Sequence, residues 1–256
     1  MKVVILCGGF GTRIRDVSDE IPKPMIPIGP YPILVHIMKH YSYYGFKDFI
    51  LCLGYKSEVI KDFFLNYKSR VNNFTLSFNN SNEIIYHSKF HDDEWKISLI
   101  DTGIYSMTGS RISQIRDLVD NDFMLTYGDA VSDINLDDLK KFHNKHQKIL
   151  TVTGVRPPGR FGELQSNDEL VYAFNEKPQV SSGRVSGGFF VANTKIFEYL
   201  KNDSDLVFEE SPISEIVKNK ELMMFKHDGF WQPMDTSRDH RLLNDMYFKK
   251  DIKWKL

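Results

Sequence analysis

The sequence predicts an α/β fold with a mixed, mostly parallel sheet flanked by helices and with added α+β elements at one edge. The first observation is an alternation, from Lys2 to about Ala130, of short β-branched runs with longer helical patterns, which is typical of crossover units. The second is a change of rhythm beyond Asp133, where one helical pattern is followed by several short strand-like pieces. No Ser-, Pro- or Gly-rich linker separates the halves, so we expect one continuous domain over 1–256 with its site in a cleft between them.

In the first half, each expected strand is a compact apolar run of the kind that is covered on both faces. The helix expected at Ile33–Tyr44 follows Pro32, which is tolerated at a helix start, and precedes Gly45, which suits a left-handed stop. A second helix is expected at Glu58–Tyr67, with Ser57 as its N-cap. The four strands are expected at Val3–Leu6, Phe49–Leu53, Ile97–Ile100 and Phe123–Thr126.

Two further regions have their own patterns. The polar stretch at about 68–97, rich in Asn, Ser and Asp with weak alternation, predicts an inserted hairpin. In the second half a helix is expected at Leu136–His146. The strand-like pieces there are Ile149–Val155, Glu163–Gln165, Leu170–Phe174 and Gly187–Val191.

Composition excludes several classes of protein. The 256 residues include 33 Lys and Arg against 34 Asp and Glu, so the net charge of -1 excludes a general polyanion binder and we expect no nucleic-acid partner. The apolar run Val3–Cys7 is shorter than the ~7–15 residues of a signal-peptide core and the ~18 of a membrane span. We therefore expect a cytoplasmic protein with no membrane partner. Cys7 and Cys52 lie in apolar runs and are expected to be buried, reduced thiols.

The segment Leu6–Arg13, of sequence LCGGFGTR, directly follows the first strand and is the most informative in the chain. Three glycines in four residues allow backbone N–H groups to approach phosphate oxygens closely. A dinucleotide fingerprint would need Gly or Ala where Ile14 stands, and a Walker loop would need Gly where Arg13 stands. The remaining alternatives are a glycine loop ending in a phosphate-binding cation and a tight turn without a ligand. The residues expected to contact a nucleotide here are Leu6, Gly8, Gly9, Gly11 and Thr12.

A second cation follows in the segment Ile21–Met25, of sequence IPKPM. Its two prolines fix φ and exclude a helix, so Lys23 is presented rigidly. A solvated loop lysine is the alternative, but the nearby glycine loop favours a functional role.

These two motifs together resemble the signature of the sugar-phosphate nucleotidyltransferases. The resemblance covers nearly the whole chain, and in order and spacing it points to the glucose-1-phosphate cytidylyltransferases within that family. It implies a Rossmann-like, nucleotidyltransferase type A-like fold, with a nucleotide-binding half at 1–130 and an acceptor-binding half at 131–256. The later segments that carry it are 32–39, 101–103, 108–111, 127–129, 157–162, 176–178, 187–191 and 229–236.

The resemblance implies attack by an acceptor phosphate oxygen on the α-phosphorus of a nucleoside triphosphate, with pyrophosphate leaving. Such a step depends on positioning and charge neutralisation, which Arg13 and Lys23 would supply as the catalytic cations. Mg²⁺ would neutralise the departing pyrophosphate and needs one or two carboxylates. Asp129 follows the carboxyl end of an expected strand, where open α/β sheets bind ligands. Asp235 matches the family position that joins it. For either aspartate alone a turn or helix-capping role is the better interpretation, and the paired match reverses that.

Other site residues rest on the same resemblance. Arg111 lies in the segment that contacts the base and ribose in relatives, although an arginine at a helix start also suits the surface. Glu176 and Lys177 are expected to face the acceptor hydroxyls and phosphate, with an exposed ion pair as the alternative. The further residues expected to contact the nucleotide are Thr108, Gly109 and Gly128.

The acceptor segment departs from the family pattern at three positions. Glucose-1-phosphate cytidylyltransferases generally carry Asn before Gly-Gly-Phe-Phe, where this chain has Ser186. Arg184 and Glu163 also differ from the glucose-specific members. Two acceptors therefore stay open, namely glucose 1-phosphate as the family default and a charged phosphate such as phosphoglutamine; Ser186 and Arg184 are the acceptor-binding candidates in either case.

The function expected from the resemblance is transfer of CMP from CTP to a small phosphorylated acceptor, giving a CDP-activated precursor for a capsule or lipopolysaccharide. A homo-oligomer is also expected. The choice of CTP rests on family likeness alone. A regulatory module that binds nucleotide without turnover is a different class, but it would lack the cations and carboxylates that this chain retains, so an enzyme is favoured.

Overall fold

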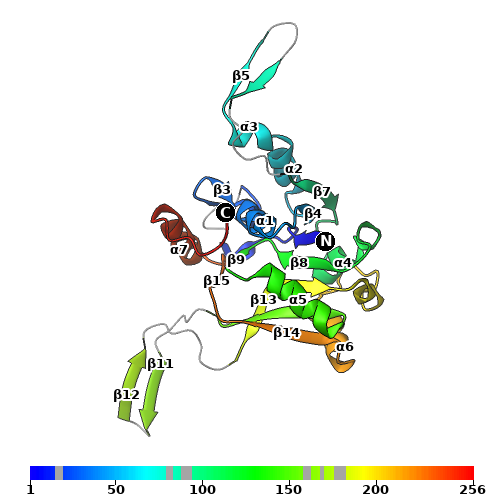
Figure 1. The fold of residues 1–256 in the computed structure, drawn as a ribbon, viewed down its shortest axis with the longest axis vertical. Coiled ribbons are helices and arrows are strands. Elements are labelled where there is room, and N and C mark those ends of the chain that lie inside the picture. Colours follow the sequence, from blue (N-terminus) through cyan, green and yellow to red (C-terminus); the bar gives the residue numbers. More distant parts are fainter. Residues whose placement is uncertain (15–19, 79–82, 88–93, 158–162, 168–169, 176–182) are drawn as a thin grey trace.

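The structure is a computed structural model of the chain (Figure 1). It describes all residues except 15–19, 79–82, 88–93, 158–162, 168–169 and 176–182, and it describes only the backbone of Arg13, 163–167 and 170–175.

A seven-stranded mixed sheet forms the centre, with strand order β14-β10-β13-β8-β1-β4-β7. The pairs β1–β4, β1–β8, β4–β7 and β10–β14 are parallel, whereas β13 runs antiparallel to both β8 and β10. The predicted α/β class with a mostly parallel sheet is therefore confirmed. The strands are β1 (Val3–Leu6), β4 (Asp48–Leu53), β7 (Lys96–Asp101), β8 (Phe123–Tyr127), β10 (Leu150–Val155), β13 (Val185–Ala192) and β14 (Leu222–His227).

The remaining strands form four separate two-stranded pairs. One hairpin, β5 with β6, lies within the stretch where an insertion is expected, and it projects from the body (Figure 1). The short pair β9–β15 joins distant parts of the chain. The strands are β2 (Pro27–Ile28), β3 (Tyr31–Pro32), β5 (Phe74–Leu76), β6 (Ile84–Tyr86), β9 (Ala130–Ser132), β11 (Glu163–Asn167), β12 (Leu170–Asn175) and β15 (Trp231–Pro233).

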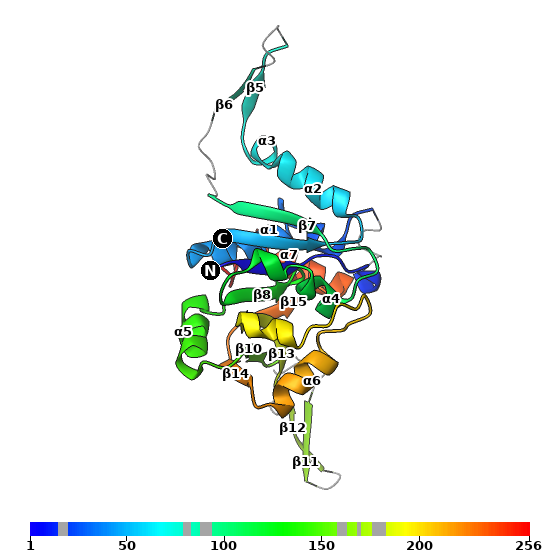
Figure 2. The same cartoon turned by 90° about the vertical axis from the view of Figure 1, so that its right-hand side faces the viewer.

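Helices flank both faces of the central sheet (Figure 2). Within the described residues no helix is long and apolar enough to cross a membrane. The helices are α1 (Ile33–Tyr43), α2 (Ser57–Leu65), α3 (Tyr67–Val71), α4 (Thr108–Ser113), α5 (Leu136–His146), α6 (Ser211–Lys218) and α7 (Ser237–Phe248).

Local signals explain the ends of α1, whereas the predicted start of α2 needs a correction. Pro32 is the N-cap of α1, directly before its first residue Ile33, and Gly45 lies just beyond its end with φ +81°, as the sequence predicts. Ser57 as the N-cap of α2 is wrong. Lys56 takes that position with φ 51°, and Ser57 is already the first helical residue, so its hydroxyl lies beyond the point where a cap can act.

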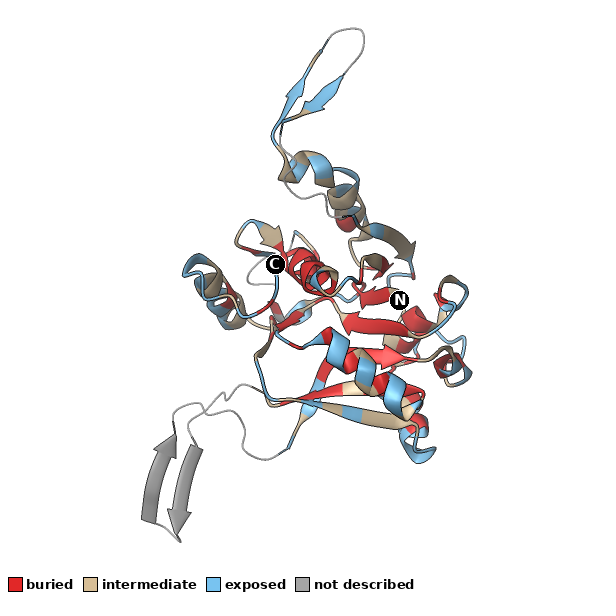
Figure 3. Ribbon diagram, viewed as in Figure 1, coloured by how far each residue is buried: buried red, intermediate tan, exposed pale blue. Residues whose placement is uncertain are grey.

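Two apolar cores lie on opposite faces of the sheet, because successive strand residues point to opposite sides. Val3 and Ile5 belong to the core under α1, whereas Val4 and Leu6 belong to the core that includes residues of α4 and α6. Figure 3 shows the buried residues concentrated along the central strands and α1. The strands therefore read as continuous apolar runs in the sequence because both of their faces are covered.

Two buried histidines of α1 bind the end of the chain. His36 Nδ1 accepts from the Trp254 indole N–H at 3.1 Å, so its Nε2–H donates to the Ile28 carbonyl at 2.8 Å. His40 Nδ1 accepts from the Lys255 backbone N–H at 3.3 Å, and its Nε2–H donates to the Ile134 carbonyl at 2.9 Å. Burial lowers the pKa of each histidine to about 4. Both rings are therefore neutral at pH 7.

We expect the free energy of unfolding to fall as the pH is lowered from about 6.5 to about 4. In the unfolded chain His36 and His40 have a pKa of 6.5 and take up protons over that range. In the folded chain their pKa is about 4, so they stay neutral until the pH approaches 4. Each histidine should cost about 3 kcal/mol of stability by pH 4. Urea unfolding at several pH values, compared between the wild type and His36→Gln, measures this slope. The exposed His87→Gln is the control, and an unchanged slope in His36→Gln would contradict the assignment.

Candidate active site

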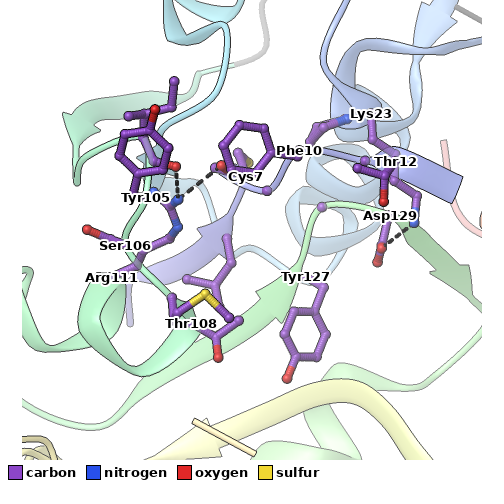
Figure 4. A pocket seen from close by; sticks show the side chains of 18 of the residues that line it. Cys7, Phe10, Thr12, Lys23, Tyr105, Ser106, Thr108, Arg111, Tyr127 and Asp129 are labelled. Carbon is purple, nitrogen blue, oxygen red and sulfur yellow. Dashed lines mark hydrogen bonds and ion pairs between the residues drawn. The ribbon is translucent and has the colours of Figure 1, made fainter. Parts of the chain in front are cut away.

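A pocket of about 350 Å³ opens at the carboxyl ends of β1 and β8 (Figure 4). It gathers residues from the glycine loop after β1, the segment after β7 and the end of β8. In the sheet β8 is next to β1, and β4 alone separates β1 from β7. This is the place where α/β sheets bind ligands. The predicted site residues that line it are Leu6, Gly8, Gly9, Gly11, Thr12, Lys23, Thr108, Arg111, Gly128 and Asp129.

The three glycines of the loop differ in what a side chain at each position would contact. Gly11 has φ +60°, and a β-carbon on it would lie 2.9 Å from the β-carbon of Lys23. A β-carbon on Gly8 would lie 2.2 Å from the guanidinium carbon of Arg111. Gly9 has nothing within 4 Å of such an atom, so its side is open. Gly8 and Gly11 are thus required by the protein itself, whereas Gly9 leaves room for a ligand. Gly109 lies behind the pocket, where a β-carbon would be 2.8 Å from the Leu206 carbonyl oxygen.

Arg111 is buried, with 4% of its surface exposed, so a surface role is wrong. Its guanidinium donates to the carbonyls of Leu53 and Gly103 at 2.8 Å and of Gly8 at 3.0 Å. Burial lowers the pKa of this guanidinium. Arg111 therefore holds the glycine loop, the end of β4 and the loop after β7 together, and its contact with a base or ribose stays a prediction.

We expect Gly8→Ala to lower the free energy of unfolding by about 1–3 kcal/mol, because its methyl group would displace the Arg111 guanidinium. Gly9→Ala is the matched control one residue away, where the open space predicts a change within ~0.5 kcal/mol. Urea unfolding of both variants measures the difference. Equal stability of the two variants would contradict the packing role of Gly8.

Lys23 stands between the two candidate metal carboxylates. Its Nζ lies 2.6 Å from Asp129 Oδ2 and 2.6 Å from Asp235 Oδ1. Burial alone would lower the pKa of the Lys23 ammonium, but Asp129 and Asp235 outweigh it and raise that pKa. The ammonium is therefore charged and bridges both carboxylates.

The two aspartates meet because short strands pair over a long sequence separation. Asp129 follows β8 and precedes β9, and Asp235 follows β15, which pairs antiparallel with β9. The Asp129 carbonyl accepts from the Met234 N–H at 2.8 Å, which continues that ladder. Thr236 then caps α7 in a capping box with Asp239, which fixes the backbone just after Asp235.

The carboxylate pair fits magnesium. One oxygen of each carboxylate lies 2.6 Å from Lys23 Nζ, so both converge on a point that the ammonium fills in this structure and that shows they can share one cation. Mg²⁺ prefers oxygen ligands and usually takes one or two carboxylates, with water and phosphate oxygens completing its shell. Among the described residues no group of three or more His, Cys, Asp or Glu side chains could hold a metal alone. Asp129 and Asp235 would therefore hold the ion together with oxygens of a bound triphosphate.

The acceptor candidates are only partly described. Glu176, Lys177 and the side chains of Arg13 and Glu163 lie outside the described residues. Ser186 is exposed near the start of β13.

Arg184 is bound by the protein itself. Its guanidinium donates to the Gly154 and His227 carbonyls at 2.9 Å each and to Asp228 at 2.6 Å. These bonds tie the ends of β10 and β14 together and account for Arg184 without an acceptor.

Sequence reasoning missed an aromatic wall and a carboxylate at this pocket. Phe10 and Tyr105 line it, with ring centroids 6.1 Å apart and exposed fractions of 39% and 76%. Glu209 accepts from the hydroxyls of Thr108, at 2.6 Å, and Tyr127. Apolar patterning treats aromatics as core, and an isolated glutamate gives no local signal, so neither feature could be identified from the sequence.

The fold and the site define an α/β protein with a glycine loop, a lysine and paired carboxylates at the carboxyl ends of its parallel strands, an arrangement suited to an anionic ligand. The family model for nucleotidyl transferases matches residues 2–236. The chain belongs to the nucleotidyl transferase family, which confirms the resemblance found in its sequence.

The relatives cover the whole chain. It is 42% identical over 257 residues to the glucose-1-phosphate cytidylyltransferase of Salmonella typhimurium, covering 100% of this chain and 99% of that one. It is also 42% identical to the probable glucose-1-phosphate cytidylyltransferase of Bacillus subtilis, covering 100% of both. A solved putative glucose-1-phosphate thymidylyltransferase from Bacillus anthracis superposes with a TM-score of 0.66 at 17% identity, covering 98% of this chain and 96% of that one. At that identity the structural likeness shows the fold alone.

Proposed function

We propose that this protein transfers CMP from CTP to glucose 1-phosphate, releasing pyrophosphate and forming CDP-glucose. The observation that carries the proposal is 42% identity, over the full length, to a glucose-1-phosphate cytidylyltransferase. The pocket supports it, because glycine-loop amides, Lys23 and a carboxylate pair suit a triphosphate with its metal.

The reaction needs charge control more than a nucleophilic side chain. A phosphate oxygen of glucose 1-phosphate attacks the α-phosphorus of CTP, and the bond from that phosphorus to the bridging oxygen of pyrophosphate breaks. Lys23 would bind the phosphate oxygens where negative charge accumulates, and Arg13 would do so from the end of the glycine loop. Mg²⁺ held by Asp129 and Asp235 would supply neutralisation of the leaving pyrophosphate.

The acceptor is proposed to bind in the half formed by 131–256, with the nucleotide in the half formed by 1–130 of one continuous domain. Glu176 and Lys177 would contact the sugar hydroxyls and the phosphate. Ser186 would replace the asparagine of relatives through a bridging water. Arg184 is already bound by protein groups, and the curated relatives are named for glucose 1-phosphate, so a charged acceptor such as phosphoglutamine is not favoured.

The proposal also includes Mg²⁺ as the metal, a cytoplasmic location, a homo-oligomer and a product used for a surface polysaccharide. The oligomer is tested by light scattering at micromolar concentration, where a monomeric mass would reject it.

The test of the activity is the initial rate of pyrophosphate release with glucose 1-phosphate and each of CTP, UTP and dTTP. We expect CTP to be strongly preferred, and equal rates would remove the cytidylyl assignment. A panel of acceptor phosphates with CTP, compared by kcat/KM, then tests glucose 1-phosphate. A value far below that of a rival acceptor would reject it.

A further inference from the structure

The segment 204–209 supports one wall of the pocket from outside. Backbone N–H groups of Met107 and Gly109 each donate at 2.8 Å to carbonyls of this segment. The Phe208 N–H donates in return to the Thr108 hydroxyl oxygen at 2.9 Å. Glu209, the next residue, is therefore held at a fixed place beside the start of α4.

Both carboxylate oxygens of Glu209 accept from hydroxyls that line the pocket. Oε2 accepts from Thr108 Oγ1 at 2.6 Å, and Oε1 accepts from the phenol of Tyr127 at the end of β8. Figure 4 shows Thr108 and Tyr127 on the side of the pocket opposite Phe10.

The direction of these bonds has a chemical consequence. A carboxylate can only accept, so the single proton of each hydroxyl points at Glu209. The remaining lone pairs of Thr108 and Tyr127 are then the only hydrogen-bonding capacity that either hydroxyl can offer a ligand. At these two points the pocket accepts hydrogen bonds and cannot donate them.

We propose that Glu209 is a positioning residue that sets the hydrogen-bond polarity of Thr108 and Tyr127, so that this wall selects the hydroxyl groups of a ribose. This rests on the proposed function, because it takes the ligand to be a nucleotide. Tyr127 is two residues before Asp129, and the ribose is the part of a nucleotide next to the phosphates. Ribose hydroxyls are the donors that such acceptors recognise, and a 2′-deoxyribose lacks one of them.

The experiment compares the Kd of CTP with that of 2′-deoxy-CTP by calorimetry, with Mg²⁺ and without an acceptor. In Glu209→Gln the amide nitrogen donates to one hydroxyl and turns its proton toward the pocket. We expect CTP to bind about tenfold more weakly, and the preference for CTP over 2′-deoxy-CTP to shrink by a similar factor. The exposed neighbour Glu210→Gln is the matched control and should keep both values.

Two further variants separate polarity from general loosening of the segment. Tyr127→Phe should also reduce the preference for CTP over 2′-deoxy-CTP. In the Tyr127→Phe background, Glu209→Gln should reduce that preference by a smaller factor than it does in the wild type. A ribose preference that is unchanged in both single variants overturns the proposal. If the chain binds another ribonucleoside triphosphate in place of CTP, the proposed function fails. The role of Glu209 is then tested by the ratio of the Kd values of that triphosphate and its 2′-deoxy form.

Discussion

Replacing Lys23 by methionine is expected to lower kcat by about 100- to 1,000-fold, the usual effect of losing one preorganised electrostatic partner. The ammonium lies 2.6 Å from both Asp129 and Asp235, at the point where the phosphates and the metal of the substrate would meet. Steady-state rates with saturating CTP and glucose 1-phosphate measure the loss. Lys47→Met, which removes a half-buried lysine bonded to Glu94 far from the pocket lining, is the control.

The same variant has a second expected result that does not depend on turnover. Without Lys23, two carboxylates that now share one cation are left facing each other, and a divalent ion becomes their best partner. We expect Lys23→Met to bind Mn²⁺ more tightly than the wild type in the absence of nucleotide, as measured by electron paramagnetic resonance. Near-normal kcat together with unchanged Mn²⁺ affinity would reject the role of Lys23 at this centre.

Replacing Asp129 by asparagine is expected to remove activity and its dependence on Mg²⁺ together. An amide oxygen is neutral and is a poorer ligand for magnesium than a carboxylate, and Asp235 alone would remain. We expect a loss of at least about 1,000-fold in kcat, measured over a Mg²⁺ titration. Asp120→Asn, at a side chain that is 82% exposed, is the control. A normal Mg²⁺ titration in Asp129→Asn would mean that other residues hold the metal.

The sequence predicted the parts of the fold that local patterns encode. Val3–Leu6 forms β1 and Leu136–His146 forms α5 with the expected bounds, because apolar runs and helical periodicity persist whatever the elements pack against. The error at Ser57 arose from a shift of one residue: Lys56 adopts a left-handed conformation that no propensity favours for lysine.

The pairing that assembles the site could not be predicted from local patterns. β9 and β15 are three residues each and lie about a hundred residues apart, so nothing in either segment specifies the other. Asp235 could be placed beside Asp129 only through family resemblance. Arg111 shows why a buried charge is hard to predict from sequence. Its partners include carbonyl groups at the end of β4, in the glycine loop and in the loop after β7, and carbonyl groups carry no sequence signal.

Gly8 and Arg111 behave as a single unit under substitution. The guanidinium lies where side chains at Gly8 and Gly54 would otherwise be, since a β-carbon on Gly54 would come within 2.6 Å of an Arg111 nitrogen. A larger residue at Gly8 is compatible only with a smaller one at position 111. At Gly54 a β-carbon would also lie 2.8 Å from the Gly8 carbonyl oxygen, a contact that no change at position 111 removes. Directed evolution for a new nucleotide preference should therefore randomise positions 8 and 111 in one library, because libraries at a single position cannot reach the compensated combinations.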